Sequence, residues 1–113
     1  MKIYHNPRCS KSREALSIII KNNIKVEIIE YLKTPITKEE ICKIIKMLGL
    51  SASDLVRKEE KLYKELYKDK KMTETECIDL LYKHPILIQR PIVIKDNRAV
   101  LGRPPINVLD LLR

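Results

Sequence analysis

The order of strand-like and helix-like apolar patterns is the feature that most limits the folds open to this chain of 113 residues. Residues 2–5 and 26–30 are rich in β-forming residues, and between them residues 10–22 carry apolar side chains on one helical face. Two further β runs, 91–94 and 99–101, precede a last apolar segment. The sequence therefore predicts a βαβ unit near one end and a ββα unit near the other.

Helical signals fill the middle of the chain. Residues 37–40 and 73–76 both have the Thr-x-x-Glu spacing of a capping box, each before an apolar helical pattern. Gly49 and Pro85 end these two patterns, and residues 52–68 between them are weakly helical. The full order predicts an α/β, thioredoxin-like fold: a mixed four-stranded sheet with a helical insertion between the βαβ and ββα halves.

Turn-forming residues and prolines shape the predicted C-terminal half. Residues 95–98 are typical of a hairpin loop, so the strands on either side are expected to be antiparallel. The two prolines at 104–105 are expected to start the last helix. That helix is predicted to bury Ile106, Leu109 and Leu112.

The length of the chain suits one hydrophobic core, since single domains usually run to about 100–200 residues. We therefore expect a single domain over residues 1–113. No run approaches the roughly 18 apolar residues of a membrane span, and the first residues lack the apolar core of a signal peptide. Three cysteines cannot all pair, which fits a reducing compartment. These features predict a cytoplasmic protein without structural disulfides.

The formal net charge of +8 raises nucleic acid as a partner. The basic residues are spread along the chain, however, and the sequence has no Trp and no Phe on which bases could stack, so a nucleic-acid binder is disfavoured. Sixteen of the basic residues are Lys and seven are Arg. We expect arginine where its planar fork is needed, as in binding a tetrahedral oxyanion.

Cys9 is the candidate nucleophile because it follows the first predicted strand and opens the first predicted helix. Free backbone N–H groups and the helix dipole stabilise a thiolate at such a position, and Arg8 and Arg13 are expected to strengthen the field. The same loop could bind an anion. Cys42 and Cys77 lie on or beside apolar helical stripes and are expected to be core residues.

The residues around Cys9 exclude two kinds of cysteine chemistry. Ser12 occupies the second position of a C-x-x-C pair, so a dithiol oxidoreductase is disfavoured. Ala15 stands where a phosphatase-like C-x5-R loop needs arginine. A lone activated cysteine must take its resolving thiol from outside, from glutathione or from another protein.

Five blocks of sequence together resemble the glutaredoxin-coupled arsenate reductase family. They are HNPRCSKSR at 5–13, YLKTP at 31–35, LVRK at 55–58, HPILIQRPIV at 84–93 and GRPP at 102–105. The blocks run from the first predicted strand to the last predicted helix, so the resemblance covers nearly the whole chain. Each block alone would be weak, whereas the set is specific.

The resemblance implies roles for individual residues. Cys9 matches the cysteine that attacks arsenate, and His5 matches a histidine thought to lower the thiol pKa. Three arginines match the family's oxyanion-binding set, namely Arg57, Arg90 and Arg103. Pro91 heads a strand, as does the cis-proline that faces the cysteine in thioredoxin folds. The residues expected to support the site are Asn6, Arg8, Ser12, Arg13 and Pro91.

The resemblance also implies a reaction and its partners. In that family glutathione joins the cysteine-arsenic adduct, and glutaredoxin resolves the resulting disulfide as arsenite leaves. Glutathione would thus be a co-substrate, with no bound metal or cofactor. The expected partners are arsenate or a similar oxyanion, glutathione and glutaredoxin, without nucleic acid or membrane, and the protein is expected to be a monomer that serves arsenic detoxification.

One departure from the family pattern keeps two other functions open. Ser10 and Lys11 stand where the best-characterised members have Gly-Thr, and they resemble an arsenate reductase-like branch. A glutathione-dependent thiol-disulfide reductase would need Cys9 but not the three arginines. An Spx-like regulator that binds RNA polymerase usually carries a C-x-x-C switch, which Ser12 removes here.

Overall fold

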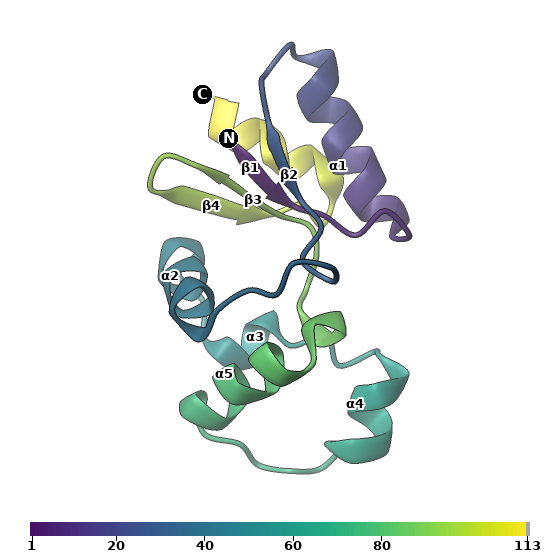
Figure 1. The fold of residues 1–113 in the computed structure, drawn as a ribbon, viewed down its shortest axis with the longest axis vertical. Coiled ribbons are helices and arrows are strands. Elements are labelled where there is room, and N and C mark those ends of the chain that lie inside the picture. Colours follow the sequence, from purple (N-terminus) through teal and green to yellow (C-terminus); the bar gives the residue numbers. More distant parts are fainter. Residues whose placement is uncertain (113) are drawn as a thin grey trace. The chain divides into compact units, whose positions relative to one another are not determined.

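A four-stranded mixed sheet forms the centre of one part of the molecule (Figure 1). The computed structural model describes residues 1–112. The strand order is β2-β1-β3-β4, with β1 parallel to β2 and antiparallel to β3, and β4 antiparallel to β3. The strands are β1 (Lys2–Tyr4), β2 (Glu27–Ile29), β3 (Ile92–Lys95) and β4 (Arg98–Leu101). This is the sheet that the sequence predicts.

The chain divides into two compact units. The first runs from Met1 to Thr34 and resumes at Arg90, so it contains the whole sheet, and the second is Pro35–Gln89. That the chain forms one domain stays a prediction. None of the helices built by residues 1–112 is long and apolar enough to span a membrane.

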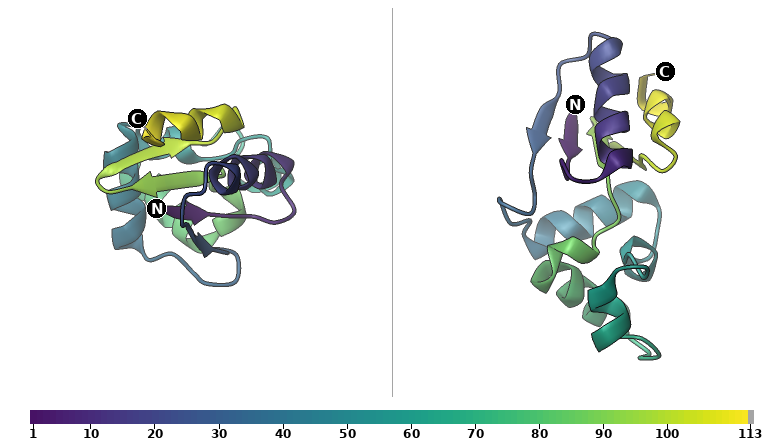
Figure 2. Two further views of the ribbon diagram at one scale, coloured as in Figure 1. Left: turned by 90° about the horizontal axis from the view of Figure 1, so that it is seen from above. Right: turned by 90° about the vertical axis from the view of Figure 1, so that its right-hand side faces the viewer.

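Two helices cover one face of the sheet in the first unit. They are α1 (Ser10–Lys21) and the 3-10 helix η2 (Pro105–Leu112), which lie side by side in Figure 2. Apolar side chains from both helices and two strands make the core, because every third or fourth residue of each helix faces the sheet. The fully buried set is Ile3, Ala15, Ile19, Val93, Val108 and Leu111.

The predicted inner face of the last helix is wrong. Pro105, Val108 and Leu111 are buried in η2, whereas Ile106 is 56% exposed, and Leu109 and Leu112 are only partly buried. A 3-10 helix has three residues per turn, so residues three apart share a face. Both sets of residues have this spacing and are largely apolar, so the sequence pattern alone does not choose between them.

The hairpin between β3 and β4 is tighter than predicted. Lys95 and Arg98 pair with each other across the two strands, which leaves Asp96 and Asn97 as the turn. Asp96 has a φ of 56°, a left-handed conformation that Asp and Asn tolerate better than most residues. The antiparallel pairing itself is confirmed.

Five short or medium helices make the second unit. Thr37 begins the first of them by accepting a hydrogen bond from Glu40 N–H, and Gly49 ends it with a φ of 68°. The weakly helical stretch is two short helices separated by residues 56–60. The helices are α2 (Lys38–Leu48), α3 (Ala52–Leu55), α4 (Lys61–Leu66), α5 (Glu74–Lys83) and the 3-10 helix η1 (Pro85–Leu87).

The capping box at the start of α5 gives a test of this reading. Thr73 accepts from Glu76 N–H, and the Glu76 carboxylate accepts from Thr73 N–H at 3.0 Å. Thr73→Ala removes the acceptor and should lower the free energy of unfolding by about 1 kcal/mol. Thr75→Ala, an exposed change on the same helix, should leave it within about 0.5 kcal/mol, as urea unfolding will measure. Equal effects of the two changes would contradict the assignment.

Candidate active site

Cys9 occupies the N-cap of α1, with an extended backbone at φ −93° and ψ 122°. Its own N–H donates to Asn6 O at 3.0 Å, which closes a tight turn after β1. Its carbonyl accepts from Arg13 N–H at 3.0 Å, the first hydrogen bond of the helix. The sulfur therefore faces N–H groups of the first helical turn that have no partner within the helix.

The pKa of the Cys9 thiol lies below its ordinary value. Burial alone would raise this pKa, but hydrogen bonds from Ser12 N–H, the Arg90 side chain and Lys11 N–H, together with the Arg90 charge, outweigh that effect. Arg90 itself is 7% exposed, and a buried guanidinium acts through a weakly screening medium. Cys9 is thus held toward the thiolate, the nucleophilic form of cysteine.

A second arginine reaches the same sulfur. Arg103 Nη1 lies 3.8 Å from Cys9 Sγ and donates to the Arg90 carbonyl at 3.0 Å. The loop after β4 therefore carries Arg103 to a point beside the segment that carries Arg90. Two guanidinium groups and two backbone N–H groups on one sulfur are donors of the kind that hold an oxyanion during nucleophilic attack.

The segments that carry the two arginines pack on each other through Pro91 and Gly102. Gly102 N–H donates to Pro91 O at 2.9 Å, and a Cβ added to Gly102 would meet Pro91 Cγ at 2.7 Å. The peptide bonds Arg90–Pro91 and Arg103–Pro104 are both cis. Gly102 lies in the GRPP block but was not predicted as a site residue, although a glycine next to Arg103 is a signal for the close approach of two segments.

His5 and Ser12 form a buried pair beneath the cysteine loop. His5 Nδ1 lies 2.6 Å from Ser12 Oγ, and Ser12 Oγ also accepts from Asn6 N–H at 3.1 Å. Ser12 is fully buried, and His5 and Asn6 are nearly so. The hydroxyl that replaces a second cysteine thus fixes the loop from the inside.

Burial, the largest influence, lowers the pKa of His5 below its ordinary value, and the charge of Arg13 lowers it further against the opposing effect of Glu30. His5 is therefore neutral at neutral pH and supplies no positive charge to the thiol. His5 can influence Cys9 indirectly through Ser12. The His5 ring is hydrogen-bonded to the Ser12 hydroxyl, and the Ser12 N–H donates to the Cys9 sulfur.

The arginines of the cysteine loop differ from Arg90 in burial. Arg8 and Arg13 are exposed, and Arg13 Nη1 donates to Pro7 O at 2.9 Å. Arg8 N–H donates to the Asn6 side chain at 3.0 Å, which helps shape the turn. Arg90 is an arginine whose hydrogen bond and charge lower the thiol pKa, and a contribution of Arg8 and Arg13 stays a prediction.

Arg57 belongs to the second unit, in the segment after α3. Its N–H donates to Leu87 O at 2.7 Å, and its Nε lies 3.3 Å from a Glu60 carboxylate oxygen. Its Nη1 is buried without a hydrogen-bond acceptor among residues 1–112. A buried N–H without a partner costs about 1–3 kcal/mol, so this group can gain from a ligand oxygen.

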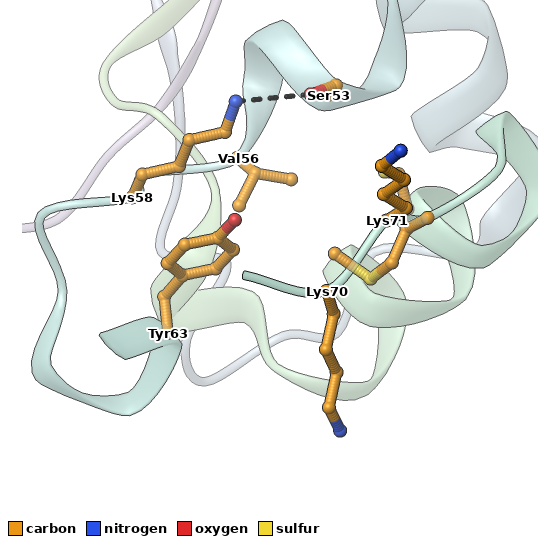
Figure 3. A pocket seen from close by; sticks show the side chains of 8 residues that line it. Ser53, Val56, Lys58, Tyr63, Lys70 and Lys71 are labelled. Atoms are coloured by element: carbon orange, nitrogen blue, oxygen red, sulfur yellow. Dashed lines mark hydrogen bonds between the residues drawn. The ribbon is translucent and has the colours of Figure 1, made fainter. Parts of the chain in front are cut away.

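A pocket of about 280 Å³ lies beside the segment that carries Arg57 (Figure 3). Val56 and Lys58, the two neighbours of Arg57, line it together with Lys70 and Lys71. In Figure 3 the ammonium groups of Lys70 and Lys71 point in different directions and do not converge on one point. This pocket therefore lacks the converging donors found around Cys9.

The remaining cysteines and the second histidine have structural surroundings. Cys77 is buried, and burial, the largest influence, raises the pKa of its thiol, while Cys42 is half-buried. His84 caps the C-terminus of α5, and its Nε2 lies 3.3 Å from the Tyr67 hydroxyl. Within the described part of the chain, no three His, Cys, Asp or Glu side chains gather as metal ligands would.

The cause of the lowered thiol pKa can be tested by alkylation. The rate of iodoacetamide attack on Cys9, followed against pH by mass spectrometry, should have its midpoint below about 8.5, the ordinary cysteine value. Arg90→Gln removes a hydrogen bond and a charge, so it should move the midpoint upward. Arg8→Gln should leave the midpoint in place. A wild-type midpoint at or above 8.5 would contradict the geometry.

The packing of Gly102 on Pro91 gives a second test. Gly102→Ala should lower the free energy of unfolding by about 1–3 kcal/mol and should raise the alkylation midpoint, because both arginine-bearing segments must move. Gly49→Ala is the control, since it strains a left-handed residue at a cost of about 1 kcal/mol in the other unit. An unchanged midpoint in Gly102→Ala would show that this contact does not position the arginines.

Comparison with known proteins identifies the relatives of the chain. The family model described as "ArsC family" matches residues 4–111. "Uncharacterized protein YfgD" of Escherichia coli K12 is 43% identical over 99% of this chain and 96% of its own length. The protein named "Arsenate reductase" of Neisseria meningitidis serogroup B is 42% identical over 96% of this chain and 94% of its own.

A solved structure agrees with the sequence matches. "Arsenate reductase from Vibrio cholerae" superposes with a TM-score of 0.92 and 40% identity, and the match covers 98% of each chain. This match supports the α/β, thioredoxin-like fold expected from the order of the elements. By its sequence and its fold, the chain belongs to the ArsC family.

Proposed function

We propose that the protein reduces arsenate to arsenite through Cys9 as its single nucleophile, with glutathione and glutaredoxin as electron donors. The observation that carries the proposal is the convergence of Arg90, Arg103 and two backbone N–H groups on the Cys9 sulfur. Relatives named "Arsenate reductase" at about 42% identity over nearly the whole chain support the choice of oxyanion.

The first chemical step is attack of the Cys9 thiolate on arsenic. A sulfur-arsenic bond forms, and an arsenic-oxygen bond breaks as hydroxide that takes up a proton and leaves as water. Arsenate is a dianion at neutral pH, so a thiolate would be repelled by it in water. The Arg90 and Arg103 guanidinium groups reduce this repulsion and stabilise the charge on the oxygens, an effect often worth a few kcal/mol per donor.

The second step needs a thiol that this loop does not supply. Ser12, fully buried, stands where a dithiol enzyme has its second cysteine. Overall, arsenic acid and two thiols give arsenous acid, one disulfide and water, and the arsenic gains the two electrons that the sulfurs lose. Glutathione supplies the second thiol in this proposal, and glutaredoxin then reduces the disulfide between glutathione and Cys9.

Arg57 is the third member of the proposed oxyanion set. Its buried Nη1, which finds no acceptor among the described residues, supports this role because a ligand oxygen would satisfy it. The match of its LVRK block to the family is the other support. The proposal uses no bound metal or cofactor and treats the protein as a cytoplasmic monomer.

Arsenate-dependent oxidation of NADPH, coupled through glutathione, glutathione reductase and glutaredoxin, tests the assignment of the nucleophile. Cys9→Ser should abolish turnover because serine is not ionised at neutral pH. Cys42→Ser and Cys77→Ser remove the other thiols and should retain turnover, although burial of Cys77 can make that variant less stable. Full activity in Cys9→Ser would overturn the mechanism.

The same assay tests the arginines. Arg57→Ala, Arg90→Ala and Arg103→Ala should each lower kcat/KM for arsenate by about 10²-fold, in line with the loss of one preorganised donor. Arg98→Ala, a change at an arginine outside the proposed set, should have little effect on kcat/KM. If wild type reduces a glutathione mixed disulfide but not arsenate, the thiol-disulfide reductase is the correct function.

A further inference from the structure

Three exposed cationic side chains lie within four residues of Cys9 in the sequence. We call Arg8, Lys11 and Arg13 the cationic rim. Arg8 directly precedes the cysteine, whereas Lys11 and Arg13 lie in the first turns of α1. Glu14 is the one acidic residue among the first 26 residues of the sequence, so the rim is not neutralised by its own segment.

The three charges of the rim form no ion pair with the described residues. Arg13 Nη1 donates only to the neutral carbonyl of Pro7. The groups that lower the pKa of Cys9 most are Arg90 and the backbone N–H groups of Ser12 and Lys11. The charges of the rim therefore remain available to a molecule that approaches the sulfur from solvent.

We propose that the cationic rim selects an anionic thiol as the second substrate of Cys9, by attracting its carboxylates toward the reacting sulfur. Arg8 and Lys11 lie on opposite sides of Cys9 along the chain. Glutathione matches this arrangement, because its thiol lies between two terminal carboxylates. The identity of the thiol rests on the proposed function, but selection by charge does not depend on arsenate.

Physical chemistry favours this use of the residue types. Guanidinium groups pair with carboxylates through two parallel hydrogen bonds, and a lysine adds a mobile point charge. Exposed charges add little to affinity in water, but they raise the rate at which an oppositely charged molecule reaches a site. The rim should therefore act on the rate of thiol or disulfide arrival, and salt should weaken its effect.

Disulfide exchange measures this selection without arsenate. The Cys9 thiolate attacks one sulfur of an aromatic disulfide, so a Cys9–sulfur bond forms, the disulfide bond breaks, and one aromatic thiolate leaves with the electron pair. The probes are dithiobis-nitrobenzoate, which carries two carboxylates, and neutral dithiodipyridine. Stopped-flow absorbance follows the leaving thiolate in the full chain carrying Cys42→Ser and Cys77→Ser.

The double variant Arg8→Gln with Lys11→Gln should lower the rate with the dianionic probe about fivefold or more at low ionic strength. The rate with the neutral probe should change less than about twofold. The difference should disappear near 1 M salt, where the Debye length is about 3 Å. The matched control is Lys21→Gln with Lys25→Gln, which removes the same charge at and beyond the other end of α1 and should preserve both rates.

Two results would overturn the proposal. An equal loss in the control pair would mean that only net charge matters, and an equal loss with both probes would mean that the thiolate itself had changed. In the coupled arsenate assay the rim variant should raise the KM for glutathione and leave the KM for arsenate unchanged. Charge-selective exchange in a protein that does not reduce arsenate would reject the proposed function and support the rim.

Discussion

The contact between the N-terminus of α1 and the Cys9 sulfur is the interaction on which the rest of the candidate site depends. Backbone N–H groups cannot be moved without unwinding the helix, so they fix where the thiolate is stable. Arg90 and Arg103 then add charge at that point from two other segments. Those segments are held together by the approach of Gly102 to Pro91. The sheet and α1 thus serve to bring one sulfur and two guanidinium groups to the same place.

Much of this arrangement could be predicted from the sequence because it depends on local signals. The place of Cys9 after a β run and before a helical pattern is local, and so is the capping box of Thr73. The buried face of η2 was predicted wrongly, since two of its three faces are largely apolar and only the packing against the sheet decides between them. The hydrogen bond between His5 and Ser12 could not be predicted either, because no local spacing rule pairs two side chains that lie on either side of a turn.

The arginines near Cys9 divide into two groups by burial. Arg90 is buried beside the sulfur. Its charge acts strongly on the thiolate there because the interior screens charges weakly, but burying the guanidinium group costs desolvation free energy. Its hydrogen bond to the thiolate offsets part of that cost. Arg8 and Arg13 are exposed, where water screens their charges. Arginines near the same cysteine can therefore differ in what they act on, which is either the sulfur or the molecule that approaches it.

Ser12 explains why charges on the outside of the cysteine loop matter as well as those at the sulfur. Because it replaces a second cysteine, the loop holds no other thiol, and in the proposed function each turnover waits for a thiol from solvent. A site of this kind gains more from fast and selective arrival of that thiol than a dithiol site would. Exposed charges around the sulfur raise the rate at which an oppositely charged thiol arrives. The loss of a second thiol at Ser12 thus gives the exposed charges of the rim a role, which is to attract the thiol that the loop lacks.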